Sequence, residues 1–294
     1  MAEKIIFIIN PISGTRSKNS IPEMIHLGLE KELYDPEIVF TEYRGHGTKL
    51  SREYLDKGVK KIIAVGGDGT VNEVATALIN TDASLGIVPI GSGNGLARHL
   101  EIPMTIKKAV RQLNVSDSIR IDYGMVNRQP FFCTCGTGFD AYVSMEFAKG
   151  NKRGIVSYLE KIVKGYFAYK PQHYRILGTN IDISTDAFLL TFANASQWGN
   201  NAYIAPKASL QDGKLDISIL SKLPISAIPT LAFELFTKMI DKDFNVSSLQ
   251  TKEITLYRET AGPFHYDGEP YEEGREITIK IIPKGLNVLV KRRY

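Results

Sequence analysis

Short apolar runs alternate with helical patterns through the first third of the chain. Four runs are predicted strands: residues 4–10, 37–41, 61–65 and 85–89. Three segments between them carry apolar residues at helical spacing: 21–33, 48–57 and 71–79. Strands that are apolar on both faces and separated by helices indicate a parallel sheet with helices on both sides. On such sheets, ligands bind at the carboxyl ends of the strands.

The pattern changes after about residue 118. Segments 119–126 and 130–135 flank a predicted hairpin turn at 127–129, and further β-rich stretches follow at 174–183, 187–194, 215–220, 253–257, 276–282 and 286–291. Two helical segments, 155–169 and 225–240, interrupt them. The predicted fold class is therefore α/β. It has an N-terminal Rossmann-like parallel sheet domain, residues 1–120, and a C-terminal antiparallel, β-rich, sandwich-like domain, residues 121–294. The last strand, within 285–294, is left open to either domain.

Composition agrees with two folded domains and limits the functions open to the chain. Of 294 residues, 43% are hydrophobic and 23% charged, and no apolar run reaches the roughly 20 residues that span a bilayer. Because the N-terminus leads directly into a predicted strand, we expect a cytoplasmic protein. The net charge of +4 is modest, and no nucleic-acid recognition motif is evident, which argues against a nucleic-acid partner. Lysines clustered around 149–170 suit a membrane surface or ATP, or form an ordinary solvated face.

The glycine-rich segment 65–73, Val-Gly-Gly-Asp-Gly-Thr-Val-Asn-Glu, ends one predicted strand and opens a helix. Glycines let backbone N–H groups approach a phosphate closely, and the helix N-terminus adds the positive end of its dipole. A carboxylate does not favour a phosphate by itself, so we expect Asp68 to meet Mg²⁺ or a hydroxyl proton. The alternative is a plain strand-to-helix turn in which Asp68 is the N-cap.

Two more loops of small residues end neighbouring predicted strands. Residues 10–14 read Asn-Pro-Ile-Ser-Gly, and residues 89–94 read Pro-Ile-Gly-Ser-Gly-Asn. Either loop alone is ordinary turn chemistry. Together with segment 65–73, they predict a phosphate site at one edge of the sheet.

In this order and spacing, the three motifs resemble the diacylglycerol kinase catalytic-domain family, which includes bacterial lipid kinases and sphingosine kinases. Thr41 with residues 45–47, Gly-His-Gly, is similar to the family's TxxxGHA stretch, with glycine in place of alanine. The resemblance implies that ATP is contacted by Asn10, Pro11, Ile12, Ser13, Gly14, Thr41, Gly67, Asp68, Gly69, Thr70, Val71, Asn72, Glu73 and Ser92. NAD kinases also carry GGDGT on a similar fold, but the loops at 10–14 and 89–94 argue against them.

The segment 265–270, His-Tyr-Asp-Gly-Glu-Pro, resembles the DGE motif of the same family. The resemblance makes Glu269 the general base that takes the proton of the lipid hydroxyl, since a hydroxyl nucleophile needs a positioned proton acceptor. Asp68 is the competing candidate for the base. The structural alternative for 267–270 is a solvent-exposed turn.

Three further aspartates have expected roles that rest on the same resemblance. Segment 209–216 is similar to the family's xxxDGxLD stretch, which implies Mg²⁺ ligation by the Asp212 carboxylate and the carbonyls of Ser209 and Lys214; a β-turn is the alternative. Asp122 matches an aspartate that supports the site. Asp140 matches the region where sphingosine kinases contact the polar head of the lipid, with a helix N-cap as the alternative.

These resemblances imply an ATP- and Mg²⁺-dependent lipid kinase whose active site lies in the cleft between the two domains. It would transfer the γ-phosphoryl group to diacylglycerol or a sphingoid base presented at a membrane surface. Peripheral membrane association is expected, a homodimer is left open, and segment 155–169 is either an interfacial helix or a helix that covers the domain. The alternative function is an NAD kinase-like or non-catalytic nucleotide-binding protein on the same fold.

Overall fold

The computed structural model describes residues 2–14, 20–149 and 165–292. The chain divides into two compact units, one made of Met1–Asp122 with Pro283–Tyr294 and the other of Tyr123–Ile282. Two paired strands, β5 (Ser116–Val126) and β16 (Glu276–Lys291), each carry the chain from one unit into the other. The first unit is therefore discontinuous in sequence, whereas the second is a single insertion.

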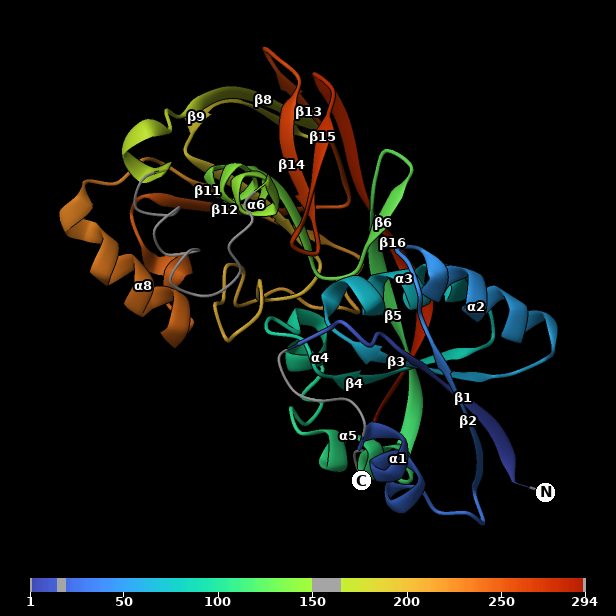
Figure 1. The fold of residues 1–294 in the computed structure, drawn as a ribbon. Coiled ribbons are helices and arrows are strands. Elements are labelled where there is room, and N and C mark those ends of the chain that lie inside the picture. The colour runs from blue at the N-terminus through green and yellow to red at the C-terminus, as the bar shows by residue number, and fades with distance from the viewer. Residues whose placement is uncertain (1, 15–19, 150–164, 293–294) are drawn as a thin grey trace. The chain divides into compact units, whose positions relative to one another are not determined.

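The first unit is a parallel sheet with helices on both faces, as predicted. Its strands lie in the order β2-β1-β3-β4, with bounds β1 (Glu3–Ile9), β2 (Tyr34–Phe40), β3 (Lys61–Gly66) and β4 (Ser84–Pro89). One face carries α1 (Ile21–Gly28) and α5 (Ile106–Leu113); the other carries α2 (His46–Asp56) and α3 (Asp68–Leu78) (Figure 1). Because both faces are covered, residues 5–9 of β1 are fully buried.

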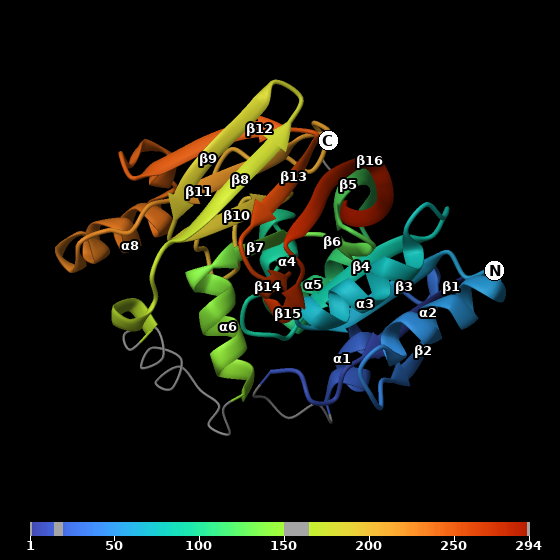
Figure 2. The same cartoon turned by 90° about the horizontal axis from the view of Figure 1, so that it is seen from above.

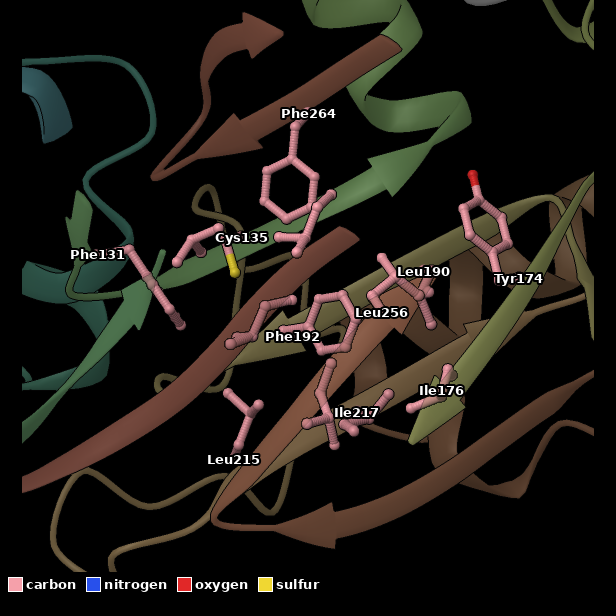
Figure 3. Packing of buried hydrophobic residues seen from close by; sticks show 14 of the residues in the cluster. Phe131, Cys135, Tyr174, Ile176, Leu190, Phe192, Leu215, Ile217, Leu256 and Phe264 are labelled. Atoms are coloured by element: carbon pink, nitrogen blue, oxygen red, sulfur yellow. The ribbon is translucent and has the colours of Figure 1, made fainter. Parts of the chain in front are cut away.

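The second unit contains two antiparallel layers (Figure 2). Six strands run in the order β12-β11-β10-β7-β14-β15, with bounds β7 (Thr134–Gly138), β10 (Leu189–Ala193), β11 (Leu215–Leu220), β12 (Val246–Thr251), β14 (Gly262–Tyr266) and β15 (Glu269–Glu273). The other layer runs β16-β13-β8-β9, with bounds β8 (Gln172–Gly178), β9 (Ile181–Ala187) and β13 (Glu253–Arg258). Side chains such as Phe192 and Leu256 meet between the layers to form the core (Figure 3). The predicted fold class is confirmed.

Two predicted element boundaries in the second unit are wrong for a physical reason. The segment 130–135 is not one strand but β6 (Gln129–Phe131) and β7, because the intervening backbone N–H groups bind a side chain instead of a neighbouring strand. The predicted β-rich segment 174–183 is a hairpin, since the chain reverses at Asn180 with φ of 60°. Conversely, 276–282 and 286–291 form one strand, β16.

The helical predictions hold only for some segments. The predicted helix 21–33 ends at Gly28, where an added Cβ would lie 2.7 Å from the Val110 side chain, so α5 packs closely against the end of α1. Of the predicted helix 155–169, residues 155–164 lie outside the described residues, and 165–168 are helical. The predicted helix 225–240 is a 3₁₀ turn (Ile225–Ala227), α8 (Ile228–Thr237) and a second 3₁₀ turn (Ile240–Lys242). Across the described segments, no helix is both long and apolar enough to cross a bilayer.

Candidate functional site

The three small-residue loops lie against one another at the ends of β1, β3 and β4. The Ile90 N–H donates to the Gly66 carbonyl at 2.9 Å, and a Cβ on Gly91 would lie 2.5 Å from the Gly67 Cα. Gly14 has φ of 68°, and a Cβ there would lie 2.1 Å from the Ile90 oxygen. Glycine is required at these contacts because the backbones approach too closely for any side chain.

Asp68 joins two of these loops. Its Oδ2 accepts the Asn94 N–H at 2.8 Å, and its Oδ1 accepts the Gly95 N–H at 2.7 Å. These amides begin the short helix α4 (Gly95–His99), so Asp68 caps α4 rather than α3, the helix that it opens. Both carboxylate oxygens are thus engaged in holding the loop 91–95 against the glycine-rich turn.

Glu73, further along α3, also organises a neighbouring loop. Its two carboxylate oxygens accept the Gly45 N–H at 2.7 Å and the Gly47 N–H at 2.9 Å. The Thr48 hydroxyl donates to the Glu73 carbonyl at 2.8 Å. The glutamate expected beside ATP therefore uses its charge on the turn that leads into α2. A Cβ at residue 47 would lie 2.8 Å from Glu73 Oε2, which explains why glycine occupies this position.

The remaining predicted nucleotide residues surround the start of α3. The Asn10 side chain donates to the Thr70 hydroxyl at 3.2 Å and accepts the Ile12 N–H at 3.0 Å, so it ties the loop 10–14 to the helix. The first intrahelical bond runs from the Val71 N–H to the Gly67 carbonyl. By helix geometry, the N–H groups before residue 71 have no intrahelical acceptor, which suits an anion. Thr41, Thr70 and Val71 are buried, whereas Ile12 and Ser92 are exposed.

In the second unit, the residues Asp267 and Gly268 form the two-residue turn of the β14–β15 hairpin, with φ of 47° and 83°. Such a pair is typical of a type I′ turn. The Asp267 carboxylate accepts the N–H groups of Phe132 at 3.0 Å, Cys133 at 2.7 Å and Thr134 at 3.2 Å. The turn is thereby fixed to β7, and Glu269, the next residue, is exposed.

A buried arginine holds the other end of this hairpin. The Arg258 guanidinium donates to the carbonyls of Gly262 at 2.9 Å, Pro263 at 3.1 Å and Glu273 at 2.6 Å, and to the Thr137 hydroxyl at 3.1 Å. Burial lowers the pKa of Arg258 from its ordinary value. The guanidinium nevertheless has acceptors for its donors, so the hairpin is held at both of its ends.

The expected metal residues lie in a turn of the second unit before β11. The Asp212 Oδ1 accepts the Lys214 N–H at 3.0 Å, and Gly213 has φ of 68°. Burial raises the pKa of Asp216, four residues on, with a smaller contribution from the nearby Asp212 charge. Asp216 Oδ1 accepts from Gln250 at 3.0 Å, while Oδ2 is buried without a hydrogen-bond partner. Two neighbouring carboxylates with an unsatisfied oxygen fit a hard divalent cation.

Sequence reasoning placed Asp216 at the end of the xxxDGxLD-like segment but gave it no ligand role. A second signal is its place among the mostly apolar residues of the strand Leu215–Leu220, where a carboxylate is out of pattern. Among the described residues, no cluster of three or more histidine, cysteine, aspartate or glutamate side chains could hold a metal ion, so backbone carbonyls or water would have to complete a ligand set.

The two remaining predicted aspartates lie in different surroundings. Asp140, at the start of α6 (Phe139–Lys149), has one oxygen 2.8 Å from His265 Nε2 on β14 and accepts the Ala141 N–H with the other. His265 lies two residues before Asp267, so this pair links α6 to the hairpin that bears Glu269. Asp122 is fully buried and accepts the Lys284 N–H at 2.7 Å, at the point where β5 and β16 leave the first unit.

Comparison with protein families matches both halves of the chain. Residues 4–126 match the family described as diacylglycerol kinase catalytic domain, and residues 133–290 match the family described as YegS C-terminal NAD kinase beta sandwich-like domain. The two matches together leave only a few residues at the centre and at the ends of the chain uncovered.

Curated relatives and solved structures agree with these matches. "Probable lipid kinase YegS" of Escherichia coli O6:K15:H31 is 30% identical, over 94% of this chain and 93% of its own. "Probable lipid kinase YegS-like" of Enterobacter sp. is 30% identical, over 83% and 82%. A crystal structure described as a diacylglycerol kinase from Bacillus anthracis shares the fold, with a TM-score of 0.77 and 20% identity over 98% of this chain and 97% of its own.

Proposed function

Because this chain belongs to the lipid kinase family of diacylglycerol kinase catalytic domains, we propose that it transfers the γ-phosphoryl group of ATP to a lipid hydroxyl. The observation that carries the proposal is the pair of hydrogen bonds by which Asp68, in the glycine-rich turn, holds the loop 91–95. It fixes closely spaced backbone N–H groups at one sheet edge, where a nucleotide phosphate gains several hydrogen bonds at once. Catalysis of phosphoryl transfer depends mainly on such positioning.

Glu269 would take the proton of the attacking hydroxyl. As the lipid oxygen bonds to the γ-phosphorus, the bond from that phosphorus to the β,γ-bridging oxygen breaks and ADP leaves. Glu269 is exposed and follows a turn that Asp267 fixes, whereas both oxygens of Asp68 hold backbone amides. The exposure of its side chain supports Glu269 as the base, because a proton acceptor must be reachable by the hydroxyl.

Asp212, with Asp216 beside it and the carbonyls of Ser209 and Lys214, would hold Mg²⁺. Carboxylate and carbonyl oxygens are the protein ligands that Mg²⁺ prefers. The buried, unpartnered Oδ2 of Asp216 is the feature of this chain that favours a cation there.

The acceptor would be diacylglycerol or a sphingoid base, at a membrane surface. The description of the Bacillus anthracis structure as a diacylglycerol kinase supports the first, and the similarity of the segment 89–97, Pro-Ile-Gly-Ser-Gly-Asn-Gly-Leu-Ala, to sphingosine kinases supports the second. Both acceptors offer a primary hydroxyl, so the same base serves either.

Purified protein should be incubated with radiolabelled ATP and Mg²⁺ and a panel of lipids in mixed micelles, with the products resolved by chromatography. We expect one lipid class to be labelled. Glu269→Gln should lower kcat by about 10²–10⁴-fold while leaving ATP-analogue affinity unchanged, since amide and carboxylate have the same size but different basicity.

Glu272→Gln is the matched control, because Glu272 is an exposed glutamate on the same strand. It should retain the parent's activity. If no lipid is labelled while the protein still binds ATP, the proposed function is wrong. If Glu269→Gln turns over lipid like the parent, the role assigned to Glu269 is wrong.

A further inference from the structure

The helix α8 presents an apolar stripe to the outside of the second unit. None of its residues is buried. Phe233 and Phe236 are 62% and 59% exposed, and Ile225, on the preceding turn, is 55% exposed. Phe233 and Phe236 are three residues apart on α8, so they lie on the same face of the helix. We call Ile225, Phe233 and Phe236 the α8 stripe.

The opposite side of α8 anchors it to the unit. Leu231 and Leu235, one turn apart, pack against a buried cluster that contains Phe188 and Leu220 of the sheet side. The Tyr203 N–H donates to the Leu235 carbonyl at 2.9 Å. Both views show α8 at the periphery of the second unit (Figures 1 and 2). The inner side of α8 therefore packs against the unit, and the residues of the α8 stripe lie on its outer, exposed side.

Two more phenylalanines of the second unit, outside the α8 stripe, are exposed. Phe244, just after α8 and its 3₁₀ turn, is fully exposed at 105%, and Phe167 is 66% exposed. The segment around Phe167 lies against the approach to α8, since the Lys222 ammonium donates to the Tyr169 carbonyl at 2.9 Å. Isolated exposed apolar residues are common, but several large ones gathered on one element mark an interaction surface.

The charges around the stripe suit an anionic partner. Lys222, Lys238 and Lys242 are exposed on the segment that contains α8. The Lys222 ammonium also donates to the Tyr169 carbonyl and the Lys238 ammonium lies over the Tyr203 ring, so Lys242 carries most of the argument for an anionic partner. Two of its acids are engaged within the unit: Asp241 pairs with Lys207 at 2.6 Å, and Asp243 accepts the Asn245 N–H at 2.7 Å. Phenylalanines with lysines beside them are the combination found on helices that lie in a membrane interface.

The apolar cluster beneath α8 also reaches the start of α6. The cluster beneath α8 includes Phe139, which begins α6 and precedes Asp140. Phe139 in turn stacks on Phe188 with ring centroids 4.6 Å apart. A membrane held at the stripe would thus be coupled through one continuous apolar cluster to the start of α6.

We propose that the α8 stripe docks the protein on a lipid bilayer with anionic headgroups, with Phe233 and Phe236 entering the interface. The proposal rests on the proposed function, since a lipid acceptor places the substrate in such a bilayer. A helix with an apolar outer face and lysines at its border lies flat in the interface, with binding strength set by buried apolar area and by attraction to anionic lipid.

The test is sedimentation of the protein with vesicles of phosphatidylcholine containing phosphatidylglycerol, without nucleotide. The double variant Phe233→Ser, Phe236→Ser should bind at least about tenfold more weakly, because two phenyl groups no longer leave water. The matched control is Leu27→Ser with Leu33→Ser, which removes two exposed apolar side chains (76% and 41% exposed) from the first unit. This control should bind like the parent, and circular dichroism should show both variants folded.

Lys242→Gln adds an independent measurement. It should weaken binding to vesicles that contain phosphatidylglycerol by about fivefold and leave binding to pure phosphatidylcholine unchanged, as expected for one lysine near an anionic surface. Equal binding of the folded phenylalanine variant and the parent would overturn the proposal, as would a loss of binding in the leucine control.

Sedimentation velocity identifies the competing occupant, a second copy of the chain. The proposal is wrong, and the stripe is a subunit interface, if three results are found together. The parent is a dimer, the phenylalanine variant is a monomer, and the two bind vesicles equally. Failure of the proposed function is distinguishable, because vesicle binding is measured without catalysis. Reduced vesicle binding by the variant supports docking even if no lipid is ever phosphorylated.

Discussion

At the scale of single residues, carboxylates act on the candidate sites through the backbone. Asp68 accepts two N–H groups, Glu73 two and Asp267 three, all from loops or strands distant in sequence. Hydrogen bonds to a charged acceptor are about twice as strong as neutral ones. Each of these side chains therefore fixes a segment that would otherwise have unsatisfied amides.

Asp68→Ala tests this role at the glycine-rich turn. Removal of the carboxylate leaves the N–H groups of Asn94 and Gly95 without their acceptor, so the loop 91–95 should separate from the turn. We expect the dissociation constant of an ATP analogue to rise at least about tenfold, with a stability loss of about 1–3 kcal/mol. Titration calorimetry and thermal unfolding measure the two effects.

Asp68→Asn should fall between parent and alanine variant, since an amide oxygen can still accept one of the two bonds. Asp82→Ala, at an exposed aspartate of the same unit, is the control and should bind like the parent. Unchanged nucleotide affinity in a folded Asp68→Ala protein would contradict the assigned role of the carboxylate.

The sequence predicted that the three small-residue loops meet at one edge of the sheet but not how their side chains are used. The glycine and turn residues at 10–14, 65–73 and 89–94 are recognisable from local sequence. The carboxyl ends of neighbouring parallel strands lie at the same edge of a sheet, so the loops that follow them meet there whatever their sequences. The partners of Asp68 are 26 and 27 residues away, and those of Asp267 more than 130. Such contacts depend on loop paths that no local pattern encodes.

At the scale of elements, the β14–β15 hairpin is the least autonomous element of the candidate site. It is short, and its turn and base are both fixed by side chains: the turn through Asp267 to β7, and the base through Arg258 of β13. Two-stranded hairpins are marginal on their own in water. The position of Glu269 is therefore set by the rest of the second unit.

Arg258→Met should release the base of this hairpin. The change leaves three partly buried carbonyls without their donor, so we expect a loss of about 3 kcal/mol in stability and a fall in lipid phosphorylation through kcat. The affinity for an ATP analogue should stay the same, because the glycine-rich loops belong to the other unit. Urea unfolding and steady-state kinetics provide the measurements.

Arg175→Met is the matched arginine control. Arg175 is exposed on β8 and pairs with Asp182 at 2.9 Å, and exposed ion pairs contribute about 1 kcal/mol or less. Equal stability losses in the two variants would show that Arg258 does not hold the hairpin.

Elements with a strong local pattern were predictable, and those defined by their neighbours were not. The buried runs of β1 and β3 were found to within one or two residues because both faces of each strand are apolar. By contrast, little periodic signal marks β12, β14 and β15. In β12 only Val246 is buried, and β14 and β15 flank the DGE motif. The break between β6 and β7 exists because Asp267 takes the amides of Phe132 and Cys133.

At the scale of the whole molecule, the first unit is closed by residues from the end of the chain. The last stretch of β16 pairs in parallel with β4, and its Leu286, Val288 and Leu289 are buried. The second unit has its own core and is continuous from Tyr123 to Ile282. The first unit should therefore fold without the second, provided that it keeps residues 283–294.

Excision of residues 123–282, with Asp122 joined to Pro283 by a short Gly-Ser linker, tests this organisation. We expect a folded protein by circular dichroism that still binds an ATP analogue and phosphorylates no lipid. Residues 1–122 alone should be unfolded or aggregated, since they lack the buried end of β16. An unfolded linked protein, or a well-folded 1–122 fragment, would refute the assignment of residues 283–294 to the first unit.

The hydrogen bond between Lys284 N–H and Asp122 Oδ1 has a consequence for how such a chain can be recombined. It holds the two ends of the insertion side by side. A gene segment coding for 123–282 can therefore be exchanged at these two adjacent junctions without changing the distance between β5 and β16 of the first unit. The second units of different relatives could then be transplanted into one first unit, which tests the division of roles under the proposed function. In such chimeras, choice of acceptor would be inherited with the insert and choice of nucleotide with the host.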